Sequence, residues 1–219
     1  MIIFGVSKFS KLMKWYVEND TEQRVSAFTV ERKYMKEPYF CGVPVIPFEE
    51  LEKQFEKNQI SILNTCGYHN MNDIRRKVFE MCRQKGYEIC DFIHSTVRTK
   101  NVLLGCGNII LERVLIQPFV EIGDGNILSA DMTVGHENCI GDFNYFSGSV
   151  RMSGVCCIGN HNFIGTNVIV KDNTQIGSYN LIGAGTYVNS NIEDFTVTSP
   201  ILCRKEKMPK KFLDRLANQ

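Results

Sequence analysis

Four histidines are the residues of this chain best suited to moving a proton near neutral pH: His69, His94, His136 and His161. An imidazole can take a proton from an attacking amine or hydroxyl because it titrates close to neutrality. His136 is followed directly by Glu137. His161 lies between two asparagines, and we interpret it as a surface residue. The sequence therefore offers His136 as a candidate general base, provided that the fold presents it to a substrate.

A six-residue repeat over residues 104–188 contains both His136 and His161. Every sixth residue there is apolar without a break: Leu104, Ile110, Ile116, Ile122, Leu128, Val134, Ile140, Phe146, Met152, Ile158, Ile164, Val170, Ile176, Ile182 and Val188. No helix has this period, and a lone strand has a period of two. Short strands wound into a solenoid of about five coils explain the pattern. Glycines just after the apolar positions and asparagines two residues before them indicate tight corners with positive φ.

Three hexads complete one triangular coil, so residues eighteen apart stack on neighbouring parallel strands roughly 4.8 Å apart. His136 comes two residues after the inward Val134, which places it at or near a corner. Gly154 is eighteen residues further on, one coil above. A carbonyl could approach its backbone N–H because no side chain intervenes. The alternative is an exposed loop histidine beside an ordinary corner glycine.

The repeat resembles the left-handed parallel β-helix of the hexapeptide-repeat acyltransferases. The left hand is taken from this resemblance, because the general crossover rule favours the right hand. Enzymes of this family are trimers that bind acetyl-CoA or another acyl-CoA between neighbouring helices. The resemblance therefore implies a homotrimer with acetyl-CoA as cosubstrate and no metal. The zinc carbonic anhydrases with the same helix need three histidines, whereas only two lie in this repeat, 25 residues apart.

Residues 1–92 alternate between strand and helix patterns, which predicts a small parallel α/β domain of Rossmann-like type. The expected strands are 2–6, 25–30, 42–46, 60–64 and 87–93, and the expected helices are 8–18, 48–57 and 70–85. The β-helix then occupies residues 93–200. Residues 201–219 form a tail with a basic amphipathic helix over 204–216, which we expect to cap the open end of the solenoid.

The combination of these two domains resembles one subgroup of sugar acetyltransferases. It includes the sialic-acid O-acetyltransferase type and the bacterial enzymes that N-acetylate UDP- or GDP-linked amino sugars. The matching stretches are Ile3–Gly5, Phe28–Val30, Gly42–Val45, Gly67 with Arg75, and Val134–Gly154. The glycine-rich turn of the nucleotide-sugar enzymes is reduced here to Gly5-Val6-Ser7-Lys8, and Tyr145 stands where some of them carry a second histidine.

The resemblance implies roles for individual residues. His136 would be the general base, Glu137 would orient its ring as an aspartate does in a catalytic triad, and the Gly154 N–H would hold the oxyanion. The residues expected near the substrate are Gly5, Ser7, Lys8, Gly67, Arg75 and Tyr145. Those expected near the cofactor are Gly154, Thr166, Lys171, Gly183, Ala184 and Gly185. We also expect three basic residues of the tail to contact the phosphates of CoA: Arg204, Lys205 and Lys207.

The sequence thus predicts an acetyl-CoA-dependent acetyltransferase acting on a nucleotide-linked amino sugar for surface polysaccharide (lipopolysaccharide O-antigen) synthesis. O-acetylation of a sugar is the alternative within the enzymes, and a non-catalytic β-helix scaffold is the alternative outside them.

Charge, hydropathy and cysteine content limit the kinds of partner and the cellular location that we expect. A net charge of +1 gives no broad attraction to nucleic acid or membranes. There is no apolar run long enough to cross a bilayer and no signal peptide, so we expect a cytoplasmic protein. Nine scattered cysteines without a CxxC pair predict a buried, reduced set rather than disulfides or a zinc site.

Overall fold

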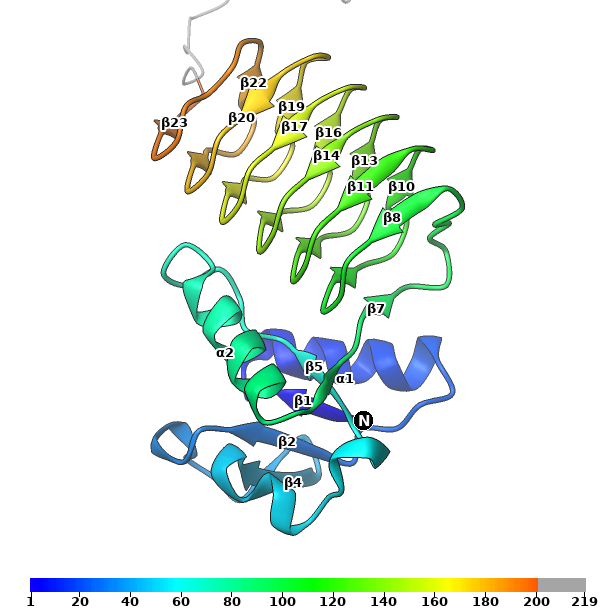
Figure 1. Ribbon diagram of the computed structural model, residues 1–219, viewed down its shortest axis with the longest axis vertical. Helices are drawn as coiled ribbons and strands as arrows, with labels where there is room; N and C mark the ends of the chain where they lie inside the picture. Colours follow the sequence, from blue (N-terminus) through cyan, green and yellow to red (C-terminus); the bar gives the residue numbers. More distant parts are fainter. Residues whose placement is uncertain (201–219) are drawn as a thin grey trace, which may run out of the picture.

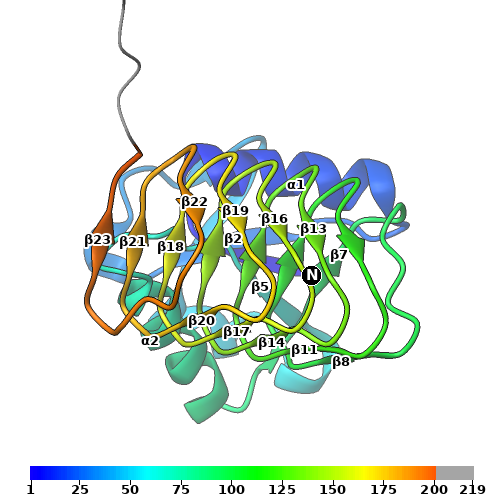
Figure 2. The same cartoon turned by 90° about the horizontal axis from the view of Figure 1, so that it is seen from above.

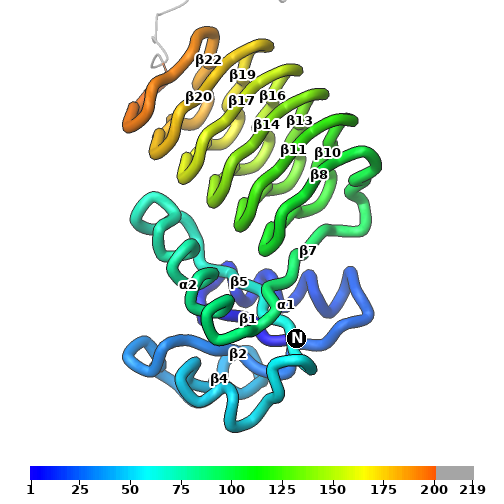
Figure 3. Tube along the Cα trace, in the orientation of Figure 1, coloured from blue at the N-terminus to red at the C-terminus, as the bar shows by residue number. Residues whose placement is uncertain are grey.

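The computed structural model describes residues 1–200, which form two units stacked along the long axis of the molecule (Figure 1). The N-terminal unit is a six-stranded sheet with helices, and the second unit is a β-helix whose successive coils have the same outline (Figure 3). No helix within residues 1–200 is long and apolar enough to cross a membrane.

The N-terminal sheet has the strand order β3-β4-β2-β1-β5-β6. Its strands are β1 (Ile2–Phe4), β2 (Ala27–Val30), β3 (Tyr39–Phe40), β4 (Val43–Pro47), β5 (Ser61–Asn64) and β6 (Glu88–Ile89). All neighbours pair in parallel except β3 with β4. Two α-helices, α1 (Lys8–Asp20) and α2 (Asp73–Gln84), pack on it, together with the short 3-10 helices η1 (Arg32–Tyr34), η2 (Phe48–Lys53) and η3 (Lys57–Gln59).

The β-helix is built from three parallel sheets, one on each side of the triangular coil (Figure 2). The β13 face holds β10 (Leu115–Ile116), β13 (Thr133–Val134), β16 (Arg151–Met152), β19 (Ile169–Val170) and β22 (Tyr187–Val188). The β14 face holds β8 (Val102–Leu104), β11 (Val120–Ile122), β14 (Cys139–Ile140), β17 (Cys157–Ile158) and β20 (Gln175–Ile176). The β15 face holds β7 (Phe92–Ile93), β9 (Ile109–Ile110), β12 (Ile127–Leu128), β15 (Tyr145–Phe146), β18 (Phe163–Ile164), β21 (Leu181–Ile182) and β23 (Val197–Thr198).

The sixfold apolar positions line the inside of the coil, as the sequence predicted. Of the fifteen, Leu104 is partly buried and packs against the core, and all the others are buried in one continuous cluster. Paired strands are offset by eighteen residues, for example Val134 beside Met152. The β-helix fold class is thereby confirmed.

The β15 face packs on the N-terminal unit. Ile109 and Ile127 point outward from this face and are buried in one cluster with Met13 and Val17 of α1. On the other side of the sheet, Phe79 of α2 contacts Phe143 at a corner of the β-helix, with ring centroids 5.3 Å apart. These contacts fix how the two units lie against each other.

The corners differ from the expectation in how they use glycine and asparagine. Positive φ occurs at the third residue after each inward position from Leu104 to Ile182, including Glu137, Phe143 and Val155, and not at Gly141. A Cβ on Gly141 would lie 2.9 Å from the carbonyl oxygen of Gly159, so glycine there makes room for the next coil. The asparagines form a buried ladder instead, in which each side chain bonds the backbone of the next coil.

Two other elements differ in the structure from those that the sequence predicted. The helix expected over 48–57 is the pair of 3-10 helices η2 and η3. The closing strand expected over 87–93 divides into β6, which ends the N-terminal sheet, and β7, which begins the β15 face. The chain passes from one unit to the other between these strands, so one strand cannot serve both. The expected helix over 204–216, with Arg204, Lys205 and Lys207, lies outside the described residues.

Candidate active site

His136 and Glu137 form the corner between β13 and β14. The Nδ1–H of His136 donates to the Glu137 carboxylate at 2.9 Å. Glu137 has φ 56°, and this left-handed turn brings its side chain back to the preceding ring. The carboxylate therefore fixes the tautomer that leaves Nε2 unprotonated and able to accept a proton.

Gly154 lies directly against the ring of His136. A Cβ built on Gly154 would be 2.6 Å from His136 Nε2, so any side chain there would displace the imidazole. The neighbouring Ser153 and Val155 N–H groups donate to carbonyls, but no acceptor is found for the Gly154 N–H among residues 1–200. The corner thus presents a proton acceptor and a free N–H donor side by side, the two groups that addition to a thioester carbonyl needs.

Two amide side chains hold this arrangement. Gln117 Oε1 accepts the His136 N–H at 2.9 Å. The buried Asn138 donates to the carbonyls of Gly135 (2.7 Å) and Ser153 (2.9 Å), so it joins the loop of His136 to the loop of Gly154. Sequence reasoning recognised Asn138 only as a corner residue. It missed Gln117, which contacts His136 across 19 residues and belongs to no repeat pattern.

The residues expected near the cofactor lie at two corners. Lys171 begins the same corner as His136, two coils further along. Thr166, Gly183, Ala184 and Gly185 lie at the corner between the β15 and β13 faces, where Gly185 N–H donates to Thr166 O at 2.8 Å. Both corners border the β13 face, so an extended ligand lying along that face could contact both sets.

A cavity of about 540 Å³ lies where the N-terminal sheet meets the β15 face. It gathers five of the six residues expected near the substrate: Gly5, Ser7, Lys8, Gly67 and Tyr145. Gly5 has φ +124°, and a Cβ there would lie 2.7 Å from Ser10 Oγ, so the turn into α1 requires glycine. No carboxylate contributes to the cavity wall within the described part of the chain.

Tyr68 and His69, which the sequence analysis did not select, also line the cavity, as do Phe9, Thr65, Cys66 and Ile74. Tyr68 meets the ring of Tyr145 edge-on at 5.1 Å, and Tyr145 stacks on Phe163 at 5.5 Å. The available signal was their place directly after β5, since ligands of parallel sheets bind at the carboxyl ends of strands.

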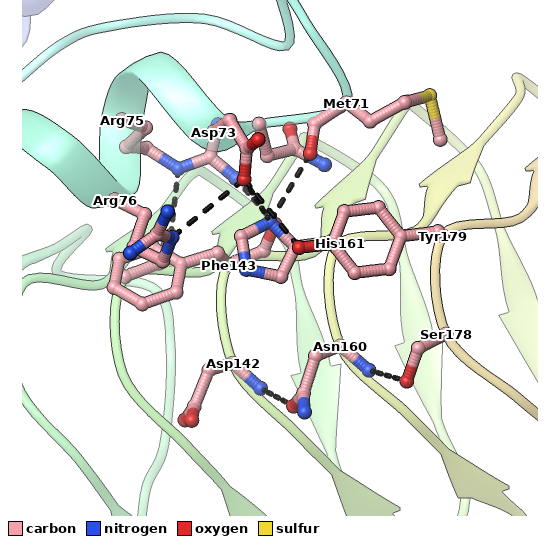
Figure 4. A network of polar contacts seen from close by, with 12 residues as sticks. Met71, Asp73, Arg75, Arg76, Asp142, Phe143, Asn160, His161, Ser178 and Tyr179 are labelled. Atoms are coloured by element: carbon pink, nitrogen blue, oxygen red, sulfur yellow. Dashed lines mark hydrogen bonds and ion pairs between the residues drawn. The ribbon is translucent and has the colours of Figure 1, made fainter.

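Arg75, the sixth residue expected near the substrate, is not part of the cavity wall. It is completely buried, and its five N–H groups donate to the carbonyls of Cys66, Gly67, Gly125, Phe143 and Asn144 at 2.7–3.4 Å. Burial lowers the pKa of its guanidinium to about 9. The side chain joins α2 and the loop after β5 to two coils of the β-helix (Figure 4).

His161 is buried, so its interpretation as a surface residue is wrong. Its ring stacks between Phe143 (5.6 Å) and Tyr179 (4.7 Å). Its Nδ1–H donates to Met71 O at 3.1 Å, with the Asp73 carboxylate 3.5 Å away (Figure 4). Burial lowers the pKa of this imidazole. The loop before α2 covers this corner, which the repeat alone could not reveal.

The corner of His136 and the cavity lie on opposite sides of the β-helix within one chain. His136 is at the corner shared by the β13 and β14 faces, whereas the cavity borders the β15 face, which lies opposite that corner in a triangular coil. No group of three or more histidine, cysteine or acidic side chains within residues 1–200 is arranged to hold a metal ion.

The chain was compared with known families and structures. Residues 158–190 match the family model for bacterial transferase hexapeptide (six repeats). No curated protein matches the sequence. Among solved structures, the acetyltransferase domain of PglB from Neisseria gonorrhoeae FA1090, in complex with acetyl coenzyme A, is similar with 22% identity and a TM-score of 0.79, covering 90% of this chain and 93% of that one.

Two further structures have the same fold. A variant of perosamine N-acetyltransferase from Caulobacter crescentus, in complex with CoA and GDP-perosamine, has 22% identity and a TM-score of 0.79 over 90% of this chain and 91% of that one. WeeI from Acinetobacter baumannii AYE has 17% identity and a TM-score of 0.75 over 90% of this chain and 94% of that one. The similarity spans both units and confirms the predicted two-unit fold.

Proposed function

We propose that the protein is an acetyl-CoA-dependent acetyltransferase that acetylates the amino group of a nucleotide-linked sugar. The observation that carries the proposal is the corner geometry, in which His136 Nε2 lies against Gly154 while Nδ1 is held by Glu137 at 2.9 Å. The fold shared with an acetyltransferase domain solved with acetyl coenzyme A and with a perosamine N-acetyltransferase supports it.

In the proposed reaction, His136 Nε2 removes a proton from the acceptor amine as its nitrogen attacks the thioester carbonyl. Glu137 stabilises the resulting imidazolium. The Gly154 N–H donates to the oxyanion of the tetrahedral adduct. The carbon–sulfur bond then breaks, the imidazolium returns its proton to the leaving CoA sulfur, and the products are the acetylated amine and CoA thiol.

The cavity fits an anionic acceptor with a flat or apolar portion. Lys8 and the N-terminal end of α1 supply positive potential, and no carboxylate opposes it in the described cavity wall. Tyr68 and Tyr145 offer aromatic surface for a base or a sugar face. A nucleoside-diphosphate sugar combines these properties, and the perosamine enzyme, similar in fold, was solved with GDP-perosamine.

The proposal includes a homotrimer, because the cavity of one chain faces away from its own His136. A neighbouring copy would bring its cavity to this corner, and CoA would lie along the β13 face between Gly154 and the corner of Thr166 and Gly185. A cytoplasmic location belongs to the same proposal.

The decisive experiment measures thiol release from acetyl-CoA in the presence of UDP-, GDP- and dTDP-linked amino sugars. Turnover with one of them, and none with the matching hydroxyl sugar, would establish N-acetylation and name the nucleotide. Turnover only with a hydroxyl acceptor would replace the proposal by O-acetylation, and no acetyl transfer to any of these sugars would refute it.

Replacing Lys8 with alanine is expected to weaken binding of the matching nucleoside diphosphate about tenfold, since a charge-assisted contact to phosphate is lost. Isothermal titration calorimetry measures this directly. Lys11→Ala is the matched control, because Lys11 is an exposed lysine of the same helix outside the cavity. Equal affinities of the two variants would exclude the cavity as the nucleotide site.

Replacing Gly154 with alanine is expected to lower kcat about 10- to 100-fold, because the new Cβ would overlap His136 Nε2 and move the imidazole by about 1 Å. Steady-state kinetics and a melting curve test this together. Gly148→Ala is the control, since Gly148 has the same place in its hexad and its Cβ would meet only Ala130 O at 3.5 Å. A similar loss in both variants would show a general effect of corner alanines.

A further inference from the structure

Cys139 and Cys157 form a pair of thiols on the outer surface of the β-helix. They are directly paired in register on the neighbouring strands β14 and β17. The residues after them, Ile140 and Ile158, are buried in the core, so both thiols point outward, and both are exposed. The expected set of buried cysteines is therefore wrong for these two and for the exposed Cys41.

The spacing of the two strands suits a covalent link between them. Neighbouring strands lie about 4.8 Å apart, within the roughly 4.4–6.8 Å between Cα atoms that disulfides span. Cys156, adjacent in sequence, cannot compete because its side chain is buried inside the coil and its Sγ donates to Lys171 O at 3.2 Å. Among Cys139, Cys156 and Cys157, only Cys139 and Cys157 therefore have thiols that point outward and can react with each other.

A groove of about 550 Å³ on the β14 face gives small molecules access to Cys139. Cys139 and Glu121 line it, together with the glycines of three successive corners, Gly105, Gly123 and Gly141. Burial raises the pKa of the Cys139 thiol, and the neighbouring Cys157 and Glu121 raise it further. The raised pKa favours the protonated form of the Cys139 thiol near neutral pH, so Cys139 reacts slowly until an oxidant is present in excess.

We propose that Cys139 and Cys157 are a reversible oxidation site, which low-molecular-weight disulfides convert into an intrachain disulfide. One thiolate attacks a disulfide RSSR, forms a mixed disulfide and releases RS⁻. The second thiolate attacks the protein sulfur of that mixed disulfide and releases the second RS⁻. Two protein thiols are oxidised and one RSSR is reduced to two RSH, so the exchange balances.

The pair lies next to the catalytic corner. Cys139 follows His136 by three residues, and Cys157 follows Gly154 by three residues, on the same two coils. The Cα spacing allows the bond, but a disulfide also needs its two Cβ atoms roughly 3.5–4.5 Å apart, which is shorter than the strand spacing of roughly 4.8 Å. The bond would therefore draw the two coils together where His136 and Gly154 must keep their separation. On the basis of the proposed function, oxidation is expected to lower turnover about tenfold or more, because small displacements of reacting groups have large effects on rate.

The test uses the full chain incubated with oxidised glutathione and then alkylated. Trypsin cuts after Arg113, Arg151 and Lys171, so Cys139 lies in peptide 114–151 and Cys157 in peptide 152–171. The expected result is a cross-link between these peptides with a loss of about 2 Da, reversed by dithiothreitol. It should vanish in Cys139→Ser and Cys157→Ser and persist in Cys156→Ser and in the control Cys41→Ser.

The outcomes separate this site from the enzyme function, because mass spectrometry needs no activity. Glutathione adducts without the 114–151 to 152–171 cross-link would overturn the proposal, as would a cross-link that survives in Cys157→Ser. A cross-link that forms while turnover stays unchanged would retain the oxidation site and reject its control of catalysis.

Discussion

His136→Ala is expected to lower kcat about 10²- to 10⁴-fold, the usual contribution of a positioned general base. The variant should keep its fold, its assembly and its affinity for CoA, because the side chain is largely exposed and bonds only Glu137 among the described residues. Thiol-release kinetics measure the first effect, and calorimetry with CoA measures the second.

Glu137→Gln is the companion variant for this prediction. The amide can still accept the hydrogen bond from Nδ1–H, but it cannot stabilise an imidazolium by its charge, so its loss of kcat should be smaller than that of His136→Ala. If the protein were a non-catalytic scaffold, the wild type itself would show no acetyl transfer in this assay. Unchanged kcat in His136→Ala would show that another group takes the proton.

Arg75→Met is expected to lower the free energy of unfolding by about 3–5 kcal/mol, because it leaves buried carbonyl groups without donors. Arg75 donates to five carbonyls from the loop after β5 and from two coils, and only that of Asn144 has another donor among the described residues, the Ile127 N–H at 3.0 Å. Methionine fills much of the same volume, so the loss reports mainly the missing hydrogen bonds. Urea denaturation of the wild type and the variant gives the difference.

Arg76→Met provides the control on the next residue of the same helix. Arg76 pairs with Glu80 at 2.6 Å on the surface, and such pairs contribute only about 0.5 kcal/mol. Equal destabilisation by both substitutions would mean that the carbonyl cluster around Arg75 finds other donors. A large effect at Arg75 alone would confirm that this residue joins the two units.

The six-residue repeat was sufficient to predict which residues of neighbouring coils lie next to each other. The period of six determined the coil, and the offset of eighteen determined which residues lie one above another. His136 and Gly154 could therefore be placed together from the sequence, and the structure puts a Gly154 Cβ 2.6 Å from Nε2. The same arithmetic pairs Cys139 with Cys157. Each of these relations depends only on neighbouring coils, whose register the apolar core enforces.

The glycine-containing turn after β1 and the glycine after β5 were selected through the resemblance to the sugar acetyltransferases, and they lie close together because strand ends in a parallel sheet share one edge. Gly5, Ser7, Lys8 and Gly67 were expected near one ligand, and the structure gathers them around a single cavity. Tyr68 and His69 belong to the same edge but were not selected, since aromatic residues in a loop carry no spacing signal.

The sequence by itself thus determined the triangular coil, its inward residues and the stacking of Gly154 over His136, because all of these follow from a short-range repeat. Only the tertiary structure decided what happens where the units meet. Arg75 became a buried carbonyl partner 69 residues from Asn144, and His161 became a stacked core residue under Met71. Both changes arise because docking of α2 removes water from a surface that the repeat alone would leave exposed, and buried polar groups must then find partners within the protein.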